Sequence, residues 1–170
     1  FSSFGSPFYL SAMRKLILLT LLLLTVMGLW AQETENLSIT QHQVMVNGKT
    51  LNYTATTGYM MMNDEEGELQ AKVFFIAYTK ADVKDVTKRP VCFTFNGGPG
   101  SSSVWLHMGG LGPKRIKMAQ DGDALAPPYE TIDNPYTWLG ETDMVFIDPM
   151  MTGYTRPAQG VDKKKFLGYE

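Results

Sequence analysis

The chain has 170 residues, 44% of them hydrophobic, with 15 Lys and Arg against 17 Asp and Glu. This length is enough for one globular domain, and the hydrophobic fraction is normal for one. The nearly balanced charge, with no basic stripe, excludes a nucleic-acid-binding surface of the usual kind. A single cysteine excludes a disulfide framework.

The first 31 residues predict a segment that is removed on export. Residues 13–15 (Met-Arg-Lys) are basic, residues 16–30 form an apolar run, and Ala31 follows. This order is typical of a secretory signal peptide. The alternatives are an uncleaved membrane anchor and a buried helix. The run is shorter than the roughly 20 residues that span a membrane, which argues against the anchor. We expect residues 1–12 to lie upstream of the natural protein, residues 13–31 to be the signal peptide, and the product to be secreted or periplasmic without stable membrane insertion.

Apolar patterning after the leader predicts β-strands. Apolar residues alternate on both sides of Asn47-Gly48, a pair that favours a two-residue hairpin turn. A further strand is predicted over 69–79. The short apolar runs 91–95 and 144–147 are typical of buried parallel strands. The segments expected to connect these strands are 63–67, 80–89 and the Pro- and Asp-rich surface loop 121–135.

Residues 96–103, Asn-Gly-Gly-Pro-Gly-Ser-Ser-Ser, follow the apolar run 91–95 directly. The glycines predict a tight turn, and the serines predict the start of a helix. A strand, a glycine turn and a helix N-terminus in this order direct backbone N–H groups at one point, which suits an anion. A phosphate loop is disfavoured, because Gly48-Lys49-Thr50 has Gln43 where the first glycine of that motif belongs.

Two blocks of sequence resemble the serine carboxypeptidase family. Residues 96–113, NGGPGSSSVWLHMGGLGP, resemble its signature NGGPGCSS, which is followed by a helix and Gly-Pro. Residues 134–138 and 143–156 resemble the family's Asn-x-x-Ser-Trp and Phe-Ile-Asp-x-Pro-x-Gly-Thr-Gly-[Phe/Tyr]-Ser. The resemblance runs from residue 90 to 160. It implies an α/β class fold, the N-terminal part of an α/β-hydrolase, in which antiparallel strands lead into a mostly parallel sheet.

The resemblance also implies roles for residues of the first block. The backbone N–H of Gly98 would form half of the oxyanion hole, and Asn96 and Gly97 would bind the terminal carboxylate of the substrate. Trp105 would face the pocket for the leaving residue. The structural alternatives are a plain turn at Gly98 and an Asn96 side chain bonded to its own backbone. Ser101, Ser102 and Ser103 are expected to cap the helix rather than to act as nucleophiles.

The chain departs from the family pattern at three positions. Gly110 stands where many relatives have a Glu that serves carboxylate binding in acid, which places an acidic optimum and strict exopeptidase specificity in doubt. Thr94 stands in place of a Trp, and Ser101 in place of a Cys. Cys92 is expected to be a buried, inert thiol.

No Gly-x-Ser-x-Gly nucleophile motif occurs anywhere in the chain. We therefore expect the catalytic Ser, Asp and His to follow Glu170. His42 and His107 are expected to have structural or surface roles, and Asp148 to position its loop rather than to act as the triad acid.

The function implied by the resemblance is a serine-type carboxypeptidase that releases C-terminal residues through a seryl acyl-enzyme. Its partner would be a peptide with a free C-terminal carboxylate, and no cofactor, metal or nucleic acid is expected. Residues 32–170 would be a truncated N-terminal portion that is inactive alone, and the oligomeric state stays open. The alternatives are an esterase or acyltransferase on the same scaffold, and a secreted module that binds carboxylates without catalysis.

Overall fold

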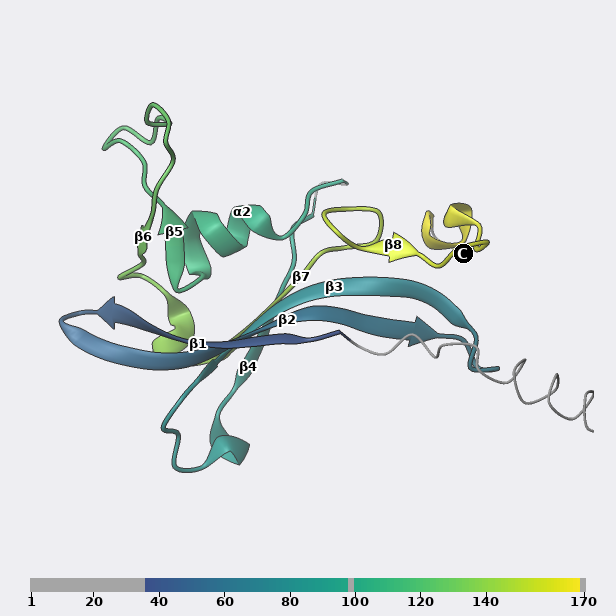
Figure 1. Ribbon diagram of the computed structural model, residues 1–170, viewed down its shortest axis with the longest axis horizontal. Helices are drawn as coiled ribbons and strands as arrows, with labels where there is room; N and C mark the ends of the chain where they lie inside the picture. Colours follow the sequence, from purple (N-terminus) through teal and green to yellow (C-terminus); the bar gives the residue numbers. More distant parts are fainter. Residues whose placement is uncertain (1–35, 98–99, 169–170) are drawn as a thin grey trace, which may run out of the picture. The chain divides into compact units, whose positions relative to one another are not determined.

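The computed structural model describes residues 36–97 and 100–168 (Figure 1), and the predicted signal peptide lies outside these residues. A mixed sheet runs through them. Its main strands, in spatial order, are β1 (Ser38–Val46), β2 (Lys49–Asn63), β3 (Leu69–Lys80), β7 (Asp143–Ile147) and β4 (Val91–Thr94).

The order of antiparallel and parallel pairing agrees with the prediction. The strand β2 pairs antiparallel with both β1 and β3, β7 is antiparallel to β3, and β4 is parallel to β7. Among the described strands this is the one parallel pair. The first hairpin turns at Asn47 and Gly48, which have φ of 49° and 75°. A positive φ causes no backbone strain in a glycine and little in an asparagine. The transition from antiparallel to parallel pairing is confirmed, and β1, β2 and β3 extend beyond the predicted segments.

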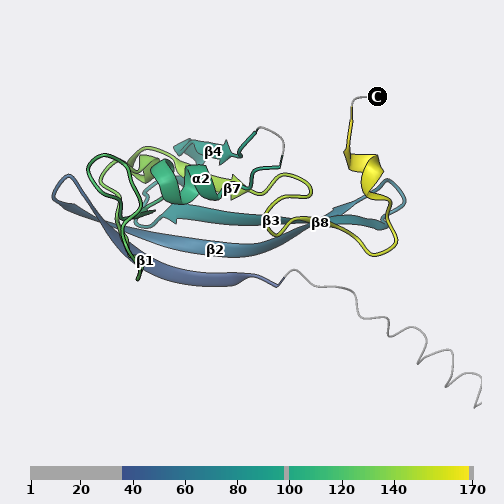
Figure 2. The same ribbon diagram turned by 90° about the horizontal axis from the view of Figure 1, so that it is seen from above.

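A short helical segment covers one face of the sheet. It starts as α2 (Val104–Leu106) and continues as the π-helical turn η2 (His107–Leu111), and both lie over the sheet in Figures 1 and 2. Gly109 and Gly110 explain the short length, because glycine disfavours helix. Leu106 and Leu111 pack against the buried core. No helix in residues 36–97 and 100–168 has the length and apolarity needed to cross a membrane. The buried hydrophobic core cluster consists of Val44, Leu51, Tyr53, Leu139, Met144 and Phe146.

A second, two-stranded sheet lies beside this helical segment. It pairs β5 (Lys114–Ile116) with β6 (Thr131–Asp133), so part of the predicted loop 121–135 is a strand. Asp133 connects the two sheets, because its Oδ2 accepts a hydrogen bond from the backbone N–H of Met45 on β1 at 2.9 Å. The remaining short elements are β8 (Arg156–Pro157), which pairs with β3, and the 3₁₀ turns η1 (Val86–Lys88), η3 (Trp138–Gly140) and η4 (Lys163–Phe166).

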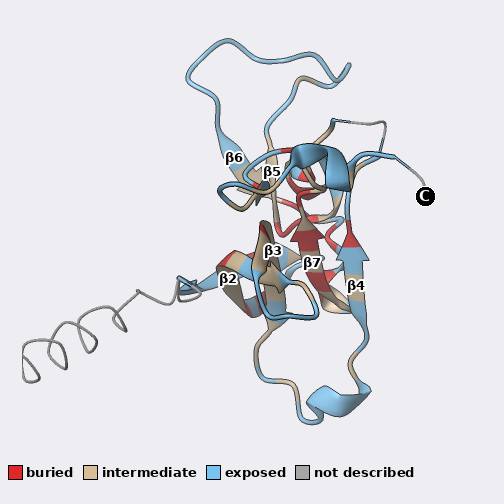
Figure 3. Ribbon diagram, turned by 90° about the vertical axis from the view of Figure 1, so that its right-hand side faces the viewer, coloured by how far each residue is buried: buried red, intermediate tan, exposed pale blue. Residues whose placement is uncertain are grey.

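The predicted burial of the run 91–95 is wrong for one face of β4. Val91, Phe93 and Phe95 are 52%, 60% and 62% exposed, whereas Thr94 is buried and Cys92 is half-buried. Figure 3 shows β4 largely pale blue beside β7, which is red and tan because its residues alternate between buried and intermediate. The physical reason is position: β4 is the last strand in the sheet order, and the helical segment covers only the face that carries Cys92 and Thr94.

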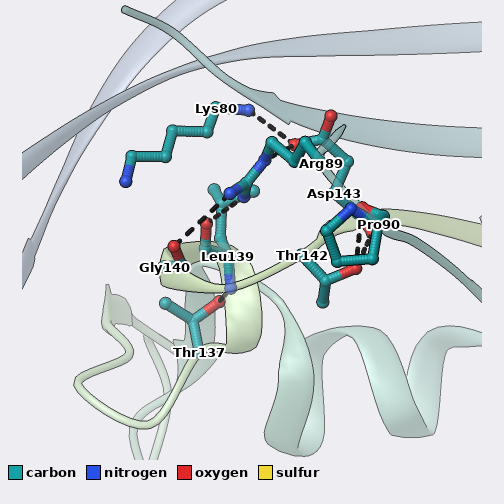
Figure 4. A network of polar contacts seen from close by, with 8 residues as sticks. All are labelled: Lys80, Arg89, Pro90, Thr137, Leu139, Gly140, Thr142 and Asp143. Carbon is teal, nitrogen blue, oxygen red and sulfur yellow. Dashed lines mark hydrogen bonds and ion pairs between the residues drawn. The ribbon is translucent and has the colours of Figure 1, made fainter. Parts of the chain in front are cut away.

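Near the first residues of β4 and β7, the side chain of Arg89 helps to join η3, the start of β7 and the end of β3 (Figure 4). The side chain of Arg89 donates from Nε to Asp143 Oδ1 at 2.6 Å, from Nη2 to the Leu139 carbonyl at 2.6 Å and from Nη1 to the Gly140 carbonyl at 3.4 Å. Asp143 Oδ1 also accepts from the backbone N–H of Lys80 at 3.0 Å. This half-buried ion pair therefore fastens η3 and the start of β7 to the end of β3.

Candidate functional site

The two sequence blocks meet because their strands are parallel neighbours. The glycine turn follows β4 and the loop with Asp148 follows β7, and Thr94 on β4 pairs with Phe146 on β7. The carboxyl ends of adjacent parallel strands share one edge of a sheet, which is where α/β proteins commonly place their ligands. The fold thus brings the start of the helical segment next to the loop after β7.

Asp148 joins the two blocks through its buried carboxylate. Its side chain is 4% exposed, and Oδ1 accepts two hydrogen bonds of 2.9 Å, from the backbone N–H and from the hydroxyl of Ser103. Oδ2 accepts a third, of 3.0 Å, from the backbone N–H of Tyr154. Ser103 is the N-cap residue of α2, and its hydroxyl is used for this bond instead of capping the helix. The expectation of serine side-chain caps therefore fails at Ser103, because Asp148 takes the hydroxyl.

The loop after β7 is shaped to enclose this carboxylate. Gly153 has a φ of +46°, and a Cβ at this position would lie 1.8 Å from Asp148 Oδ2. Only a glycine fits such a position. The hydroxyl of Thr155 donates to the Asp148 carbonyl at 2.7 Å and accepts from the backbone N–H of Phe74 on β3 at 2.9 Å. Asp148 thus links the loop after β7 to the start of the helical segment through its hydrogen bonds to Ser103, Tyr154 and Thr155.

The other end of the helical segment is held by the Asn-x-x-Thr part of the second block. Asn134 has no exposed surface, and its Nδ2 donates to the Gly110 carbonyl at 2.6 Å and to the Gly112 carbonyl at 2.8 Å. The hydroxyl of Thr137 donates to the Leu111 carbonyl at 2.8 Å. The last carbonyls of a helix have no partner within it. Asn134 and Thr137 supply the missing donors.

The residues predicted to bind substrate lie at the exposed side of this edge. Asn96 is half-buried, and its Oδ1 is enclosed without a hydrogen-bond partner in the described part of the chain. Gly97 is exposed and has open space where a Cβ would lie. Trp105 on α2 is 67% exposed. Gly98, the predicted oxyanion residue, lies outside the described residues.

The two histidines have different environments. His42 is exposed on β1, where its Nε2 lies 2.8 Å from Thr40 Oγ1 and its ring stacks on Tyr53. His107 is 8% exposed at the start of η2, and its Nε2 is hydrogen bonded to the Tyr78 hydroxyl at 2.6 Å. Burial lowers the pKa of His107 to about 4, against a smaller opposite effect of the Asp148 charge, and burial raises the pKa of Tyr78.

Sequence patterns did not reveal the roles of Asn134, Thr137 and Tyr78. The first two belong to a recognised motif, but their partners are backbone carbonyls more than twenty residues away. A signal was available, since a short helix that ends in Gly-Pro needs donors for its last carbonyls. Nothing in the pattern of β3 distinguishes Tyr78. Within residues 36–97 and 100–168 no cluster of His, Cys, Asp or Glu is arranged to hold a metal ion.

Comparison with known proteins identifies relatives of this chain. The family model described as serine carboxypeptidase matches residues 46–165. Carboxypeptidase Y of Saccharomyces cerevisiae is 32% identical over 135 residues, which cover 74% of this chain and 23% of the relative. Serine carboxypeptidase-like 36 of Arabidopsis thaliana is 30% identical over 109 residues, which cover 64% of this chain and 20% of the relative.

Among solved structures, the crystal structure of Kex1(delta)p, a prohormone-processing carboxypeptidase from Saccharomyces cerevisiae, matches with 28% identity and a TM-score of 0.48. The match covers 67% of this chain and 23% of that one. The chain thus spans less than a quarter of the length of each of these proteins.

Proposed function

The chain belongs to the serine carboxypeptidase family, and we propose that it carries the substrate-carboxylate and oxyanion side of a site that removes C-terminal residues from peptides. One observation carries this proposal. The Asn96 side chain lies at the carboxyl end of β4, and its enclosed Oδ1 has no partner in the described residues. A buried acceptor that the fold leaves unpaired costs free energy, which an N–H group of a bound peptide can recover, while Nδ2 of the same amide can donate to the terminal carboxylate of that peptide.

The remaining assignments follow from that position. The amide of Asn96 and the backbone of Gly97 would bind the terminal carboxylate of a peptide, since neutral donors bind it at any pH. Trp105, largely exposed on α2, would contact the leaving residue. The Gly98 N–H would stabilise the oxyanion of a seryl acyl-enzyme pathway. Asp148 and Ser103 would hold the helix start, and with it the glycine turn, in place.

We also propose how the chain is divided into segments and where the catalytic residues lie. Residues 1–12 would lie upstream of the natural protein, residues 13–31 would direct export, and residues 32–170 would form the first part of the hydrolase domain. The nucleophile, its histidine and the triad acid would follow Glu170 in the gene. The 170-residue chain alone would then release no amino acid from a peptide.

A comparison of matched substrates tests the function. The complete reading frame would be expressed and assayed with an N-blocked dipeptide as the free acid, as the C-terminal amide and as the methyl ester. We expect release of the C-terminal residue from the free acid. Hydrolysis restricted to the ester would support an esterase or acyltransferase instead. Binding of the free acid without hydrolysis would support a carboxylate-binding module.

Replacement of Asn96 by Ala tests the carboxylate assignment. A hydrogen bond to a charged group contributes about 1.5–3 kcal/mol, so KM for the free acid should rise about 10- to 150-fold with kcat little changed. The ester should be affected much less. Asn63→Ala, an exposed asparagine at the end of β2, is the matched control. Equal losses on both substrates would refute a carboxylate contact.

A further inference from the structure

The helical segment 104–111, which carries the glycine turn at its start, is held on the sheet at three places. At its start Ser103 bonds to Asp148, and at its end Asn134 and Thr137 bond to backbone carbonyls. In its middle, the His107 ring bonds to the Tyr78 hydroxyl on β3 at 2.6 Å. We call this third contact, between His107 and Tyr78, the histidine latch.

His107 is connected to both of the other contacts through its backbone. Its N–H donates to the Ser103 carbonyl at 2.9 Å, and its own carbonyl accepts from the Gly112 N–H at 3.0 Å. Gly112 also packs directly on the imidazole, since a Cβ there would lie 2.8 Å from His107 Cδ2. A displacement of His107 would therefore be transmitted to both ends of the segment.

The surroundings of the latch are aromatic, with His107 buried and Tyr78 partly buried. The His107 ring centroid lies 4.7 Å from that of Phe146 and 5.4 Å from that of Tyr78. Tyr53 packs edge-on against the far side of Tyr78. Such a site holds a neutral imidazole well and an imidazolium poorly, because a buried charge lacks the solvation that water provides.

We propose that the histidine latch is an acid-sensitive contact, which holds segment 104–111 on β3 at neutral pH and releases it when His107 takes up a proton. Three groups that can ionise lie near the latch. Tyr78 from β3 and Tyr53 from β2 are neutral in acid and cannot balance the new charge. The carboxylate of Asp148, after β7, attracts the imidazolium charge, but it already accepts hydrogen bonds from Ser103 and Tyr154.

The direction of the effect follows from linkage. In the held segment the pKa of His107 is about 4, whereas the released imidazole has its ordinary value of 6.5. The held state is therefore fully favoured above pH 6.5 and loses its advantage as the pH falls toward 4. The difference corresponds to a shift on the order of a hundredfold in the ratio of released to held segment.

Release would also remove the fixed start of the glycine turn. If the chain acts as proposed above, acid would then lower kcat/KM by disordering the oxyanion side of the site. That consequence rests on the proposed function. The latch itself does not, and its test needs no catalysis.

Hydrogen exchange of the 170-residue chain tests the latch directly. Exchange of peptides that cover residues 103–112 would be measured from pH 7 to pH 4 and corrected for the intrinsic effect of pH. We expect protection to fall on the order of a hundredfold in the wild type. His107→Gln keeps a partner for Tyr78 but does not titrate, so it should retain most of its protection at pH 4. His42→Gln, the exposed histidine, is the matched control and should behave like the wild type.

Two results would overturn the proposal. The first is a wild-type segment that keeps its protection at pH 4. The second is a His107→Gln variant that loses as much protection as the wild type, which would assign the effect to carboxylates such as Asp148. Should the variant fail to fold, an NMR titration of the wild-type imidazole decides. A His107 that titrates near 6.5 in the folded chain contradicts the latch, and one that titrates near 4 supports it.

Discussion

At the scale of single residues, the contact between Asp148 and Ser103 depends on a third residue, Gly153, in the loop after β7. Gly153 leaves room for the Asp148 carboxylate because it has no Cβ, and its φ of +46° is one that other residues adopt only with strain. The carboxylate can therefore turn Oδ1 toward Ser103 while Oδ2 binds the Tyr154 N–H. A change at Gly153 should act on the start of the helix.

We expect Gly153→Ala to lower the free energy of unfolding by about 3 kcal/mol or more, because the new methyl group would collide with the carboxylate. Gly160→Ala is the control: its φ is +86°, and nothing lies within 4 Å of an added Cβ. It should cost only the backbone strain, about 1–2 kcal/mol. Urea denaturation of both variants makes the comparison. Equal losses would mean that the contact with Asp148 contributes nothing.

At the scale of elements, segment 104–111 owes its position to partners from elsewhere in the chain. Its length is below what an isolated helix needs to be stable in water, and Gly109 and Gly110 weaken it further. Asn134 gives its end the donors that the helix itself lacks. The Asn-x-x-Thr motif therefore acts as a C-terminal cap supplied from a distant segment.

Asn134→Asp tests this cap. An ionised carboxylate has no N–H and would place a negative charge against the Gly110 and Gly112 carbonyls, so the free energy of unfolding should fall by about 3 kcal/mol or more. The exposed Asn63→Asp should change it by less than about 0.5 kcal/mol. Thermal or urea unfolding provides the measurement. A neutral result for Asn134→Asp would show that the carbonyls find other partners.

At the scale of the whole molecule, one face of β4 is left without cover in the described structure. Val91 and Phe93 on the last strand of the sheet order, and Phe95 directly after it, form an exposed apolar row. Exposed apolar surface on an edge strand favours association between molecules. The isolated chain should therefore self-associate through this face.

Phe93→Lys should reduce that association, since a charge on an edge strand opposes pairing. The free energy of unfolding should stay within about 0.5 kcal/mol of the wild type, because the side chain is already exposed. Tyr136→Lys, a change at another highly exposed aromatic residue, is the control. Light scattering and sedimentation would measure the effect. Unchanged association of Phe93→Lys would place the contact elsewhere.

Features set by neighbouring residues could be predicted from the sequence, whereas contacts between distant residues could not. Local signals predicted the hairpin at Asn47-Gly48 and the strands of the sheet, because hydrophobic alternation and turn chemistry act over a few residues. The bond of Tyr78 to His107 and the ion pair of Arg89 with Asp143 were not predictable. They join residues 29 and 54 positions apart, and such pairs depend on strand register and helix placement. For the same reason the outward face of β4 escaped prediction.

The bond between Ser103 and Asp148 spans 45 positions of the chain, and this has a consequence during synthesis. A ribosome that adds about 5–20 residues per second needs roughly 2–9 seconds to make that stretch. Throughout this interval the glycine turn and its short helix have left the point of synthesis ahead of the residues that hold them. Asn134 is made before Asp148, so the end of the helix can be fixed before its beginning. The start of the helix, and with it the glycine turn, can therefore be fixed only after residue 148 has been made.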